Sequence, residues 1–174
     1  HRNPAMNIDE RHLGLMPGNE DKQAYNKIAE LAHLIDEQVD LEALMSVANT
    51  APEIITTHQT PQIKRGEPVR IAIARDAAFG FYYPGDLEAM TAAGAELVEM
   101  DTLLDAELPE VDGLFIGGGF PETQMAALEA NEGLRSSIKT AIESGLPTYA
   151  ECGGLMYLSR AITWQGERHE MVGI

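Results

Sequence analysis

The chain contains a single cysteine, Cys152, in the run Tyr149-Ala150-Glu151-Cys152-Gly153-Gly154. The surrounding pattern predicts a strand that ends at Ala150 and a helix that begins at Gly153, which is the layout of a nucleophile elbow. The helix N-terminus favours the thiolate, the attacking form of cysteine, and the Gly153 N–H can donate to an oxyanion. The run therefore predicts a nucleophilic thiol, whereas the alternative is a buried structural cysteine.

A second candidate loop is the glycine run Ile116-Gly117-Gly118-Gly119-Phe120-Pro121-Glu122, which follows another predicted strand. Three successive glycines let the backbone take positive φ and bring N–H groups close to a ligand, where they can stabilise an oxyanion. The spacing matches neither GxGxxG nor GxxxxGK(S/T), the two common phosphate-binding patterns. A tight turn without a ligand is the alternative.

The elements that must position these loops alternate between strand and helix. Short apolar runs predict strands over residues 69–74, 96–100, 114–116 and 146–150. Helices are predicted over residues 84–93, 121–129, 132–144 and 153–161. This alternation predicts an α/β fold, a parallel sheet with helices on both faces. Both loops then lie at the carboxyl ends of strands, where such sheets bind ligands.

The first part of the chain has a different pattern. An amphipathic helix is predicted over residues 21–39, and Asp40 is the expected cap of a second helix over residues 41–48. Three prolines and few apolar residues in the following stretch are typical of a linker. We therefore predict a helical segment over residues 1–50, a linker over residues 51–68 and the α/β domain over residues 69–174.

Composition excludes several classes of protein. The net charge of −16 disfavours binding to nucleic acid or to anionic lipid. No run of about 18 apolar residues occurs, so no membrane span is predicted. One cysteine cannot form an internal disulfide framework or a CxxC pair. The chain begins with His1 rather than Met, which indicates a fragment of a longer polypeptide.

Three segments together resemble a known family. They are residues 75–83 (RDAAFGFYY), 114–122 (LFIGGGFPE) and 149–158 (YAECGGLMYL). The chain is similar to the glutamine amidotransferase domain of cobyrinic acid and hydrogenobyrinic acid a,c-diamide synthases, and residues 10–15 resemble the exit from that family's ATP-binding domain. The resemblance implies a flavodoxin-like class I amidotransferase fold, preceded by the tail of a synthetase domain.

The chemistry that the resemblance implies has two parts. Cys152 would hydrolyse glutamine through a glutamyl thioester, with the Gly118 and Gly153 N–H groups as the oxyanion hole. Ammonia would then pass to a synthetase site, where ATP and Mg²⁺ activate the a- and c-acetate carboxylates of a corrin precursor of cobalamin. The expected location is the cytoplasm. The sequence leaves open the oligomeric state, a homodimer included, and whether the corrin carries cobalt.

The resemblance also suggests the residues that contact glutamine. We expect these to be Gly117, Gly119, Phe120, Glu122, Phe81 and Tyr82. The aromatic loop over residues 79–83 has two alternatives, the interface with the synthetase domain and simple packing on the sheet edge. Glu151 is a family feature without an assigned role, and a structural hydrogen-bond acceptor is its alternative.

The chain departs from the family in two respects. It has no GxxxxGK(S/T) loop, so the ATP and Mg²⁺ sites are expected outside it, and no metal site is expected within it. The family's amidotransferase half continues further to a histidine base near its C-terminus, so the domain over residues 69–174 is expected to be truncated at its C-terminal end. His169 is expected to be a surface histidine in a polar hairpin. The remaining histidines, in the tail or linker, are poor candidates: His1, His12, His33 and His58. We therefore expect little or no glutaminase activity from this chain alone.

Two other classes of function stay open. The same cysteine elbow serves hydrolases and peptidases that act on other substrates. A buried, inert Cys152 would instead indicate a non-catalytic domain that contacts a partner.

Overall fold

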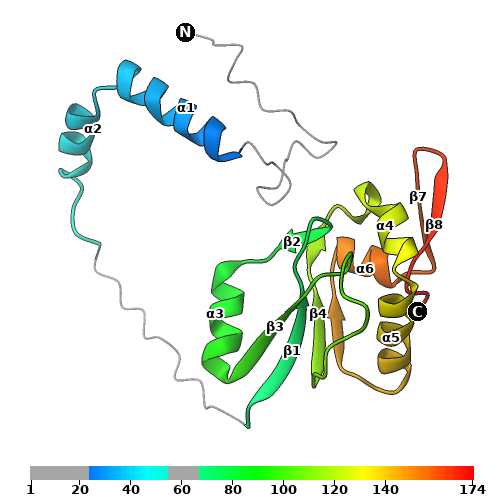
Figure 1. Cartoon of the computed structure of the whole chain (residues 1–174). Helices are drawn as coiled ribbons and strands as arrows, with labels where there is room; N and C mark the ends of the chain where they lie inside the picture. The colour runs from blue at the N-terminus through cyan, green and yellow to red at the C-terminus, as the bar shows by residue number, and fades with distance from the viewer. Residues whose placement is uncertain (1–23, 55–66) are drawn as a thin grey trace. The chain divides into compact units, whose positions relative to one another are not determined.

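The computed structural model describes residues 24–54 and 67–174 (Figure 1). The chain consists of two compact units, residues 1–61 and residues 62–174. The predicted boundaries after residues 50 and 68, and the assignment of the first segment to a synthetase domain, stay predictions. No helix in the described ranges is long and apolar enough to cross a bilayer.

The first unit contains two helices, α1 (Ala24–Gln38) and α2 (Leu41–Ala48). Asp40 caps α2 as expected, because its side chain accepts a hydrogen bond of 2.9 Å from the Ala43 N–H. The first three residues of the predicted helix over 21–39, and most of the predicted linker, lie outside the described residues.

The second unit is built on a four-stranded sheet. Its strands are all parallel and lie in the order β3-β1-β4-β6. Their bounds are β1 (Val69–Ala74), β3 (Ala95–Met100), β4 (Gly113–Ile116) and β6 (Thr148–Ala150). The predicted α/β fold with a parallel sheet is therefore confirmed.

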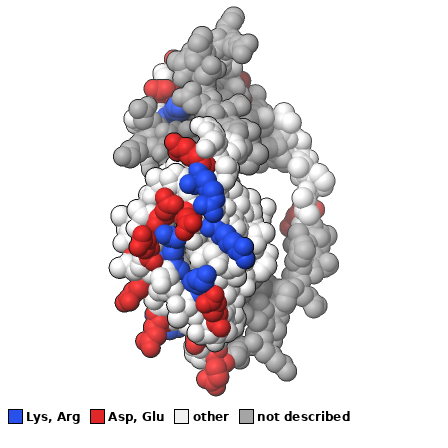
Figure 2. Space-filling view, turned by 90° about the vertical axis from the view of Figure 1, so that its right-hand side faces the viewer, with Lys and Arg blue, Asp and Glu red and all other residues white. Residues whose placement is uncertain are grey.

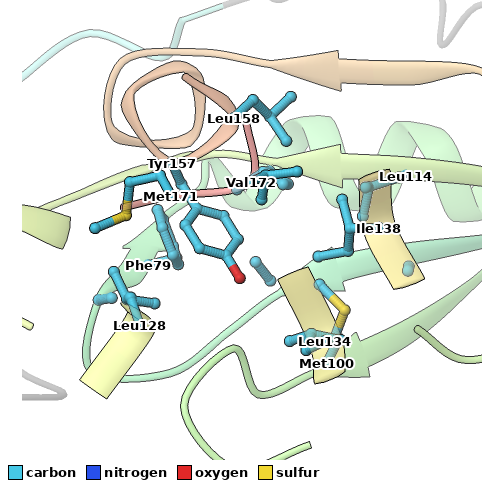
Figure 3. Close-up of a cluster of buried hydrophobic side chains, with 14 of the residues drawn as sticks. Phe79, Met100, Leu114, Leu128, Leu134, Ile138, Tyr157, Leu158, Met171 and Val172 are labelled. Atoms are coloured by element: carbon cyan, nitrogen blue, oxygen red, sulfur yellow. The ribbon is translucent and has the colours of Figure 1, made fainter. Parts of the chain in front are cut away.

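One face of the sheet carries the buried core. Side chains alternate between the faces of a strand, so Ala72 and Ala74 of β1 point to the same face as Leu114 and Ile116 of β4. This face packs against three helices, α4 (Met125–Ala130), α5 (Glu132–Glu143) and α6 (Gly153–Leu158). Figure 3 shows the centre of this core, where Tyr157 of α6 points its ring among side chains from the sheet and the helices.

The opposite face is covered by one helix, α3 (Pro84–Ala93), which ends at Gly94 with φ of 109°. Beside it an apolar pocket of about 610 Å³ lies over β1, β4 and β6, lined among others by Ile71, Phe115 and Tyr149. Helices thus lie on both faces, as expected, but one face is covered far less than the other.

Two predicted helices differ from the structure at one end. Residues 121–129 do not form one helix: a 3-10 turn (Pro121–Thr123) precedes α4, because Gln124 takes φ of −123° and ψ of 16°. The helix predicted to reach residue 161 ends at Leu158, because Ser159 is extended and donates its hydroxyl to the Met156 carbonyl. A hairpin of β7 (Ala161–Trp164) and β8 (Glu167–Glu170) follows.

Two short strands were not predicted. β2 (Phe79–Phe81) pairs antiparallel with β5 (Gly118–Gly119), which is part of the glycine run. Each is too short to show a periodic pattern, so the pairing depends on bringing two distant loops together. The loop after β1 therefore lies against the glycine run.

Candidate active site

Cys152 lies on a strained turn between β6 and α6. Its φ is 49° and its ψ is −115°, a backbone conformation that residues other than glycine rarely adopt and that costs on the order of 1–3 kcal/mol. The residue is exposed. A strained residue at the carboxyl end of a strand, lifted above the sheet at the start of a helix, is the geometry of a nucleophile elbow.

The two glycines after Cys152 allow α6 to approach the sheet. A Cβ added to Gly154 would lie 2.2 Å from the Ile116 carbonyl oxygen, and one added to Gly153 would lie 2.9 Å from the Gly119 carbonyl oxygen. The Gly154 N–H donates to two carbonyls, that of Glu151 at 2.8 Å and that of Gly117 at 3.0 Å. The start of α6 is thus hydrogen-bonded directly to the glycine run.

The glycine run lies beside the thiol-bearing residue. A Cβ added to Gly118 would lie 3.7 Å from the Cys152 Cβ atom. Gly153 is the first residue of α6, so its N–H has no acceptor within that helix. The structure therefore brings Cys152, Gly118 and Gly153 together at one edge of the sheet. Their chemical roles stay predictions.

The other two glycines of the run, Gly117 and Gly119, make close contacts within the protein. The Gly117 N–H donates to the Tyr82 hydroxyl at 3.1 Å, while its carbonyl accepts from Gly154. A Cβ added to Gly119 would lie 1.9 Å from the Ala78 carbonyl oxygen, because β2 crosses at that point. A Cβ added to Gly117 would lie 2.7 Å from the Tyr82 ring and 2.9 Å from the Phe81 carbonyl oxygen, so neither position has room for a side chain.

The side chains predicted to contact glutamine differ in accessibility. Phe81 is partly exposed, and its Cβ lies 3.2 Å from a Cβ added to Gly118. Phe120 is 1% exposed and meets the Phe81 ring edge-on at 5.3 Å, and Glu122 is 7% exposed. Phe81 is thus partly accessible beside Gly118, whereas Phe120 and Glu122 are buried. Contact of any of them with glutamine stays a prediction.

Comparison with known proteins agrees with this geometry. The model of the CobB/CobQ-like glutamine amidotransferase domain matches residues 70–174. The chain belongs to this family. Its relatives include proteins named cobyrinate a,c-diamide synthase.

The relative from Magnetococcus marinus is 43% identical over 178 residues, which cover 99% of this chain and 38% of that protein. The one from Listeria innocua is 41% identical over 173 residues, 99% of this chain and 38% of that protein. The one from Methanosarcina acetivorans is 42% identical over 172 residues, 93% of this chain and 35% of that protein. The chain thus spans well under half the length of the curated relatives it matches.

Glu151 lies on the face of the sheet that carries α3 and the apolar pocket, away from the core. The Tyr149 hydroxyl donates to the Glu151 carboxylate at 3.0 Å, and this hydrogen bond raises the pKa of Tyr149. Both residues line the apolar pocket, and the Tyr149 ring meets Phe115 edge-on at 5.4 Å. Glu151 therefore acts as an acceptor for its neighbour, which is the structural alternative stated above.

His169 is less exposed than the sequence suggested. It lies on β8, and its side chain is only 19% exposed. Figure 2 shows one side of the molecule, on which acidic and basic side chains intermix. The Nδ1 atom of His169 lies 2.8 Å from Glu129 of α4, and its Nε2 atom lies 3.6 Å from Glu167. The sequence missed this pair because 40 residues separate the partners. Both ring nitrogens face carboxylates rather than the thiol.

The His169–Glu129 pair predicts a pH-dependent stability. The hydrogen bond to Glu129 raises the pKa of His169, and the Glu170 N–H, followed by His169, lowers the pKa of Glu129. Because the pKa of His169 is raised in the folded state, its stabilising contribution is full below the ordinary pKa of 6.5 and is lost as the pH rises through the folded value. Because the pKa of Glu129 is lowered in the folded state, its stabilising contribution is full above the ordinary pKa of 4.5 and is lost as the pH falls through the folded value. The pair therefore stabilises most between about pH 4.5 and 6.5.

We expect His169→Gln to lower the urea midpoint of the hairpin most at pH 5–6 and least above pH 8. Trp164, the single tryptophan, lies on β7 and provides the fluorescence signal. A matched His33→Gln variant should show no such pH profile in this signal, because His33 lies on α1 in the other unit. An equal destabilisation by His169→Gln at every pH would contradict the ionic character of the pair.

The described residues do not fit ATP or Mg²⁺. The sequence has no GxxxxGK(S/T) loop, and the described ranges contain no group of three or more His, Cys, Asp or Glu side chains arranged to hold a metal ion. No chemical step at this site is therefore assigned to either group.

Proposed function

We propose that the chain is the glutamine-hydrolysing part of an amidoligase that amidates the a- and c-acetate carboxylates of cobyrinic or hydrogenobyrinic acid in cobalamin biosynthesis. The observation that carries the proposal is the positive φ of Cys152 at an elbow that adjoins Gly118. The name shared by the relatives supports the choice of the corrinoid substrate.

The proposed reaction begins with attack of the Cys152 thiolate on the γ-carboxamide carbon of glutamine. The carbonyl oxygen becomes an oxyanion, which accepts hydrogen bonds from the Gly118 and Gly153 N–H groups. The amide nitrogen then takes up a proton, the C–N bond breaks as the carbonyl re-forms, and ammonia leaves. Water hydrolyses the remaining γ-glutamyl thioester to give glutamate and restores the thiol.

The base that would ionise the thiol is not assigned. His169 is bound by carboxylates, and no contact between a histidine and Cys152 is seen among the described residues. We therefore expect the 174-residue chain to hydrolyse glutamine slowly or not at all by itself. ATP and Mg²⁺ would act at a synthetase site elsewhere in the parent enzyme, which we place in the cytoplasm.

Labelling of the chain tests the proposal directly. A glutamine-analogue diazo-ketone is expected to modify Cys152 alone, and free glutamine is expected to slow the reaction in proportion to its occupancy of the site. Intact-mass measurement gives the extent, and peptide mapping gives the position. D-glutamine is the matched control and should protect poorly.

Two other results would replace the proposal. Protection by other amides but not by glutamine would indicate a hydrolase of different specificity. A thiol that is inert even to iodoacetamide in the folded chain would indicate a non-catalytic domain.

A further inference from the structure

Tyr82 makes a bridge between the ends of two strands of the sheet. Its hydroxyl donates to the Ala74 carbonyl at 2.6 Å, at the end of β1, and accepts from the Gly117 N–H at 3.1 Å, just after β4. A second carbonyl, that of Phe115, lies farther away at 3.5 Å, so the single proton of the hydroxyl is directed to Ala74.

The bridge is rigid because the ring is also held. The Tyr82 ring meets Phe115 edge-on at 5.1 Å, and a Cβ added to Gly117 would lie 2.7 Å from the ring atom Cε1. Burial raises the pKa of Tyr82 to about 12, so the phenol keeps its proton near neutral pH. The hydroxyl therefore uses its donor and one acceptor position within the protein, and the ring is packed.

Gly117 is held from both sides as a result. Its N–H is bound by Tyr82, and its carbonyl is bound by the Gly154 N–H at the start of α6. The Gly117 carbonyl and the Gly118 N–H belong to one planar peptide group, so the orientation of the first sets the orientation of the second. Tyr82 holds the preceding peptide group, Ile116–Gly117, whereas the Gly154 N–H holds the Gly117–Gly118 group. The two contacts together limit rotation about the φ and ψ bonds of Gly117, and so limit the direction of the Gly118 N–H.

We propose that Tyr82 is a positioning residue that orients the Gly118 N–H of the oxyanion hole through its hydrogen bond to Gly117. This inference rests on the proposed function, because it requires that Gly118 binds the oxyanion. It replaces the expectation that Tyr82 contacts glutamine itself, since the geometry directs its hydroxyl to the backbone of two strands.

Tyr82→Phe tests the inference because it removes one oxygen atom and keeps the ring. Two reagents are compared on the chain: a glutamine-analogue γ-chloromethyl ketone, whose carbonyl would lie in the oxyanion hole, and a methanethiosulfonate, which reacts at sulfur and forms no oxyanion. Both consume the same thiolate, so the ratio of their rate constants does not depend on its concentration. We expect this ratio to fall by about tenfold in Tyr82→Phe, less than the 10²–10³ that follows loss of an oxyanion-hole donor.

Tyr83→Phe is the matched control, because Tyr83 is the next residue and is 74% exposed. The ratio of the two rate constants in Tyr83→Phe should equal that of the wild type. If the wild type prefers the L-glutamine analogue but the ratio is unchanged in Tyr82→Phe, the positioning role of Tyr82 is overturned and the proposed function is not. A wild type that does not prefer the L-glutamine analogue over its D-enantiomer would overturn the proposed function, and the role of Tyr82 with it.

A measurement on the wild type covers the case in which Tyr82→Phe does not fold. Amide hydrogen exchange, followed by NMR, should show that the Gly117 N–H is protected although it lies outside the four-stranded sheet. Rapid exchange of this N–H in the folded wild-type chain would overturn the inference without any variant. In a folded Tyr82→Phe chain, the same N–H should exchange faster, while core amides such as that of Ile138 keep their rates.

Discussion

Cys152→Ala is expected to abolish glutamine-driven amidation when it is introduced into the full-length protein, with a loss of about 10⁴-fold or more. The reason is that the thioester has no other nucleophile on which to form. Amidation with added ammonium ions should keep its wild-type rate, because free ammonia bypasses the amidotransferase site. Rates with each nitrogen donor, measured by chromatography of the corrinoid products, test the prediction.

A second substitution at the same residue separates catalysis from folding. Cys152→Gly also lacks the thiol, but glycine tolerates the φ of 49° at this position. We therefore expect both variants to be inactive with glutamine, while Cys152→Gly has a free energy of unfolding about 1 kcal/mol higher than that of Cys152→Ala. Retention of glutamine-driven activity in either variant would contradict the assignment of Cys152 as the nucleophile.

Gly154→Ala is expected to have a large effect on stability, a loss of about 3 kcal/mol. The added methyl group would lie 2.2 Å from the Ile116 carbonyl oxygen, and a backbone atom within the sheet cannot move aside as a flexible side chain can. The start of α6 must then shift away from β4, and the hydrogen bond from the Gly154 N–H to Gly117 is lost. Urea unfolding followed by circular dichroism measures the loss.

The same substitution should also disturb the thiol. Displacement of α6 moves Cys152 relative to Gly118, so selective labelling by the glutamine analogue should disappear. Gly85→Ala is the matched control: this glycine lies near the start of α3, and an added Cβ there meets nothing within 4 Å. It should leave labelling unchanged and leave stability equal or slightly higher. Equal behaviour of the two variants would mean that the close approach of α6 to β4 is not required.

Local sequence signals predicted several boundaries in full. Asp40 marked the start of α2, Pro84 and Gly94 marked the two ends of α3, and a β-branched run marked β1. These signals act through residues that are close in the sequence, by capping, restricted φ or periodic burial. They also sufficed to place Cys152 between a strand and a helix.

Interactions between distant segments were not predictable in the same way. The pairing of β2 with β5 and the contact of His169 with Glu129 join residues about 40 positions apart. The 3-10 turn before α4 and the early end of α6 likewise replaced helical turns that local propensity favoured. In each case, tertiary packing determined a conformation for which the local sequence carries only a weak signal.

The sequence by itself determined the α/β class, the family and the position of Cys152 on a strand-to-helix turn, because each depends on local pattern or on a long ordered motif. Only the tertiary structure decided that Cys152 takes a positive φ, that Gly118 lies beside it and that Tyr82 holds Gly117. The physical reason is that these features are contacts between the ends of β1, β4 and β6, which become neighbours only after the sheet has formed. The strain at Cys152 persists because Gly153 and Gly154 pack α6 against the backbone of the glycine run.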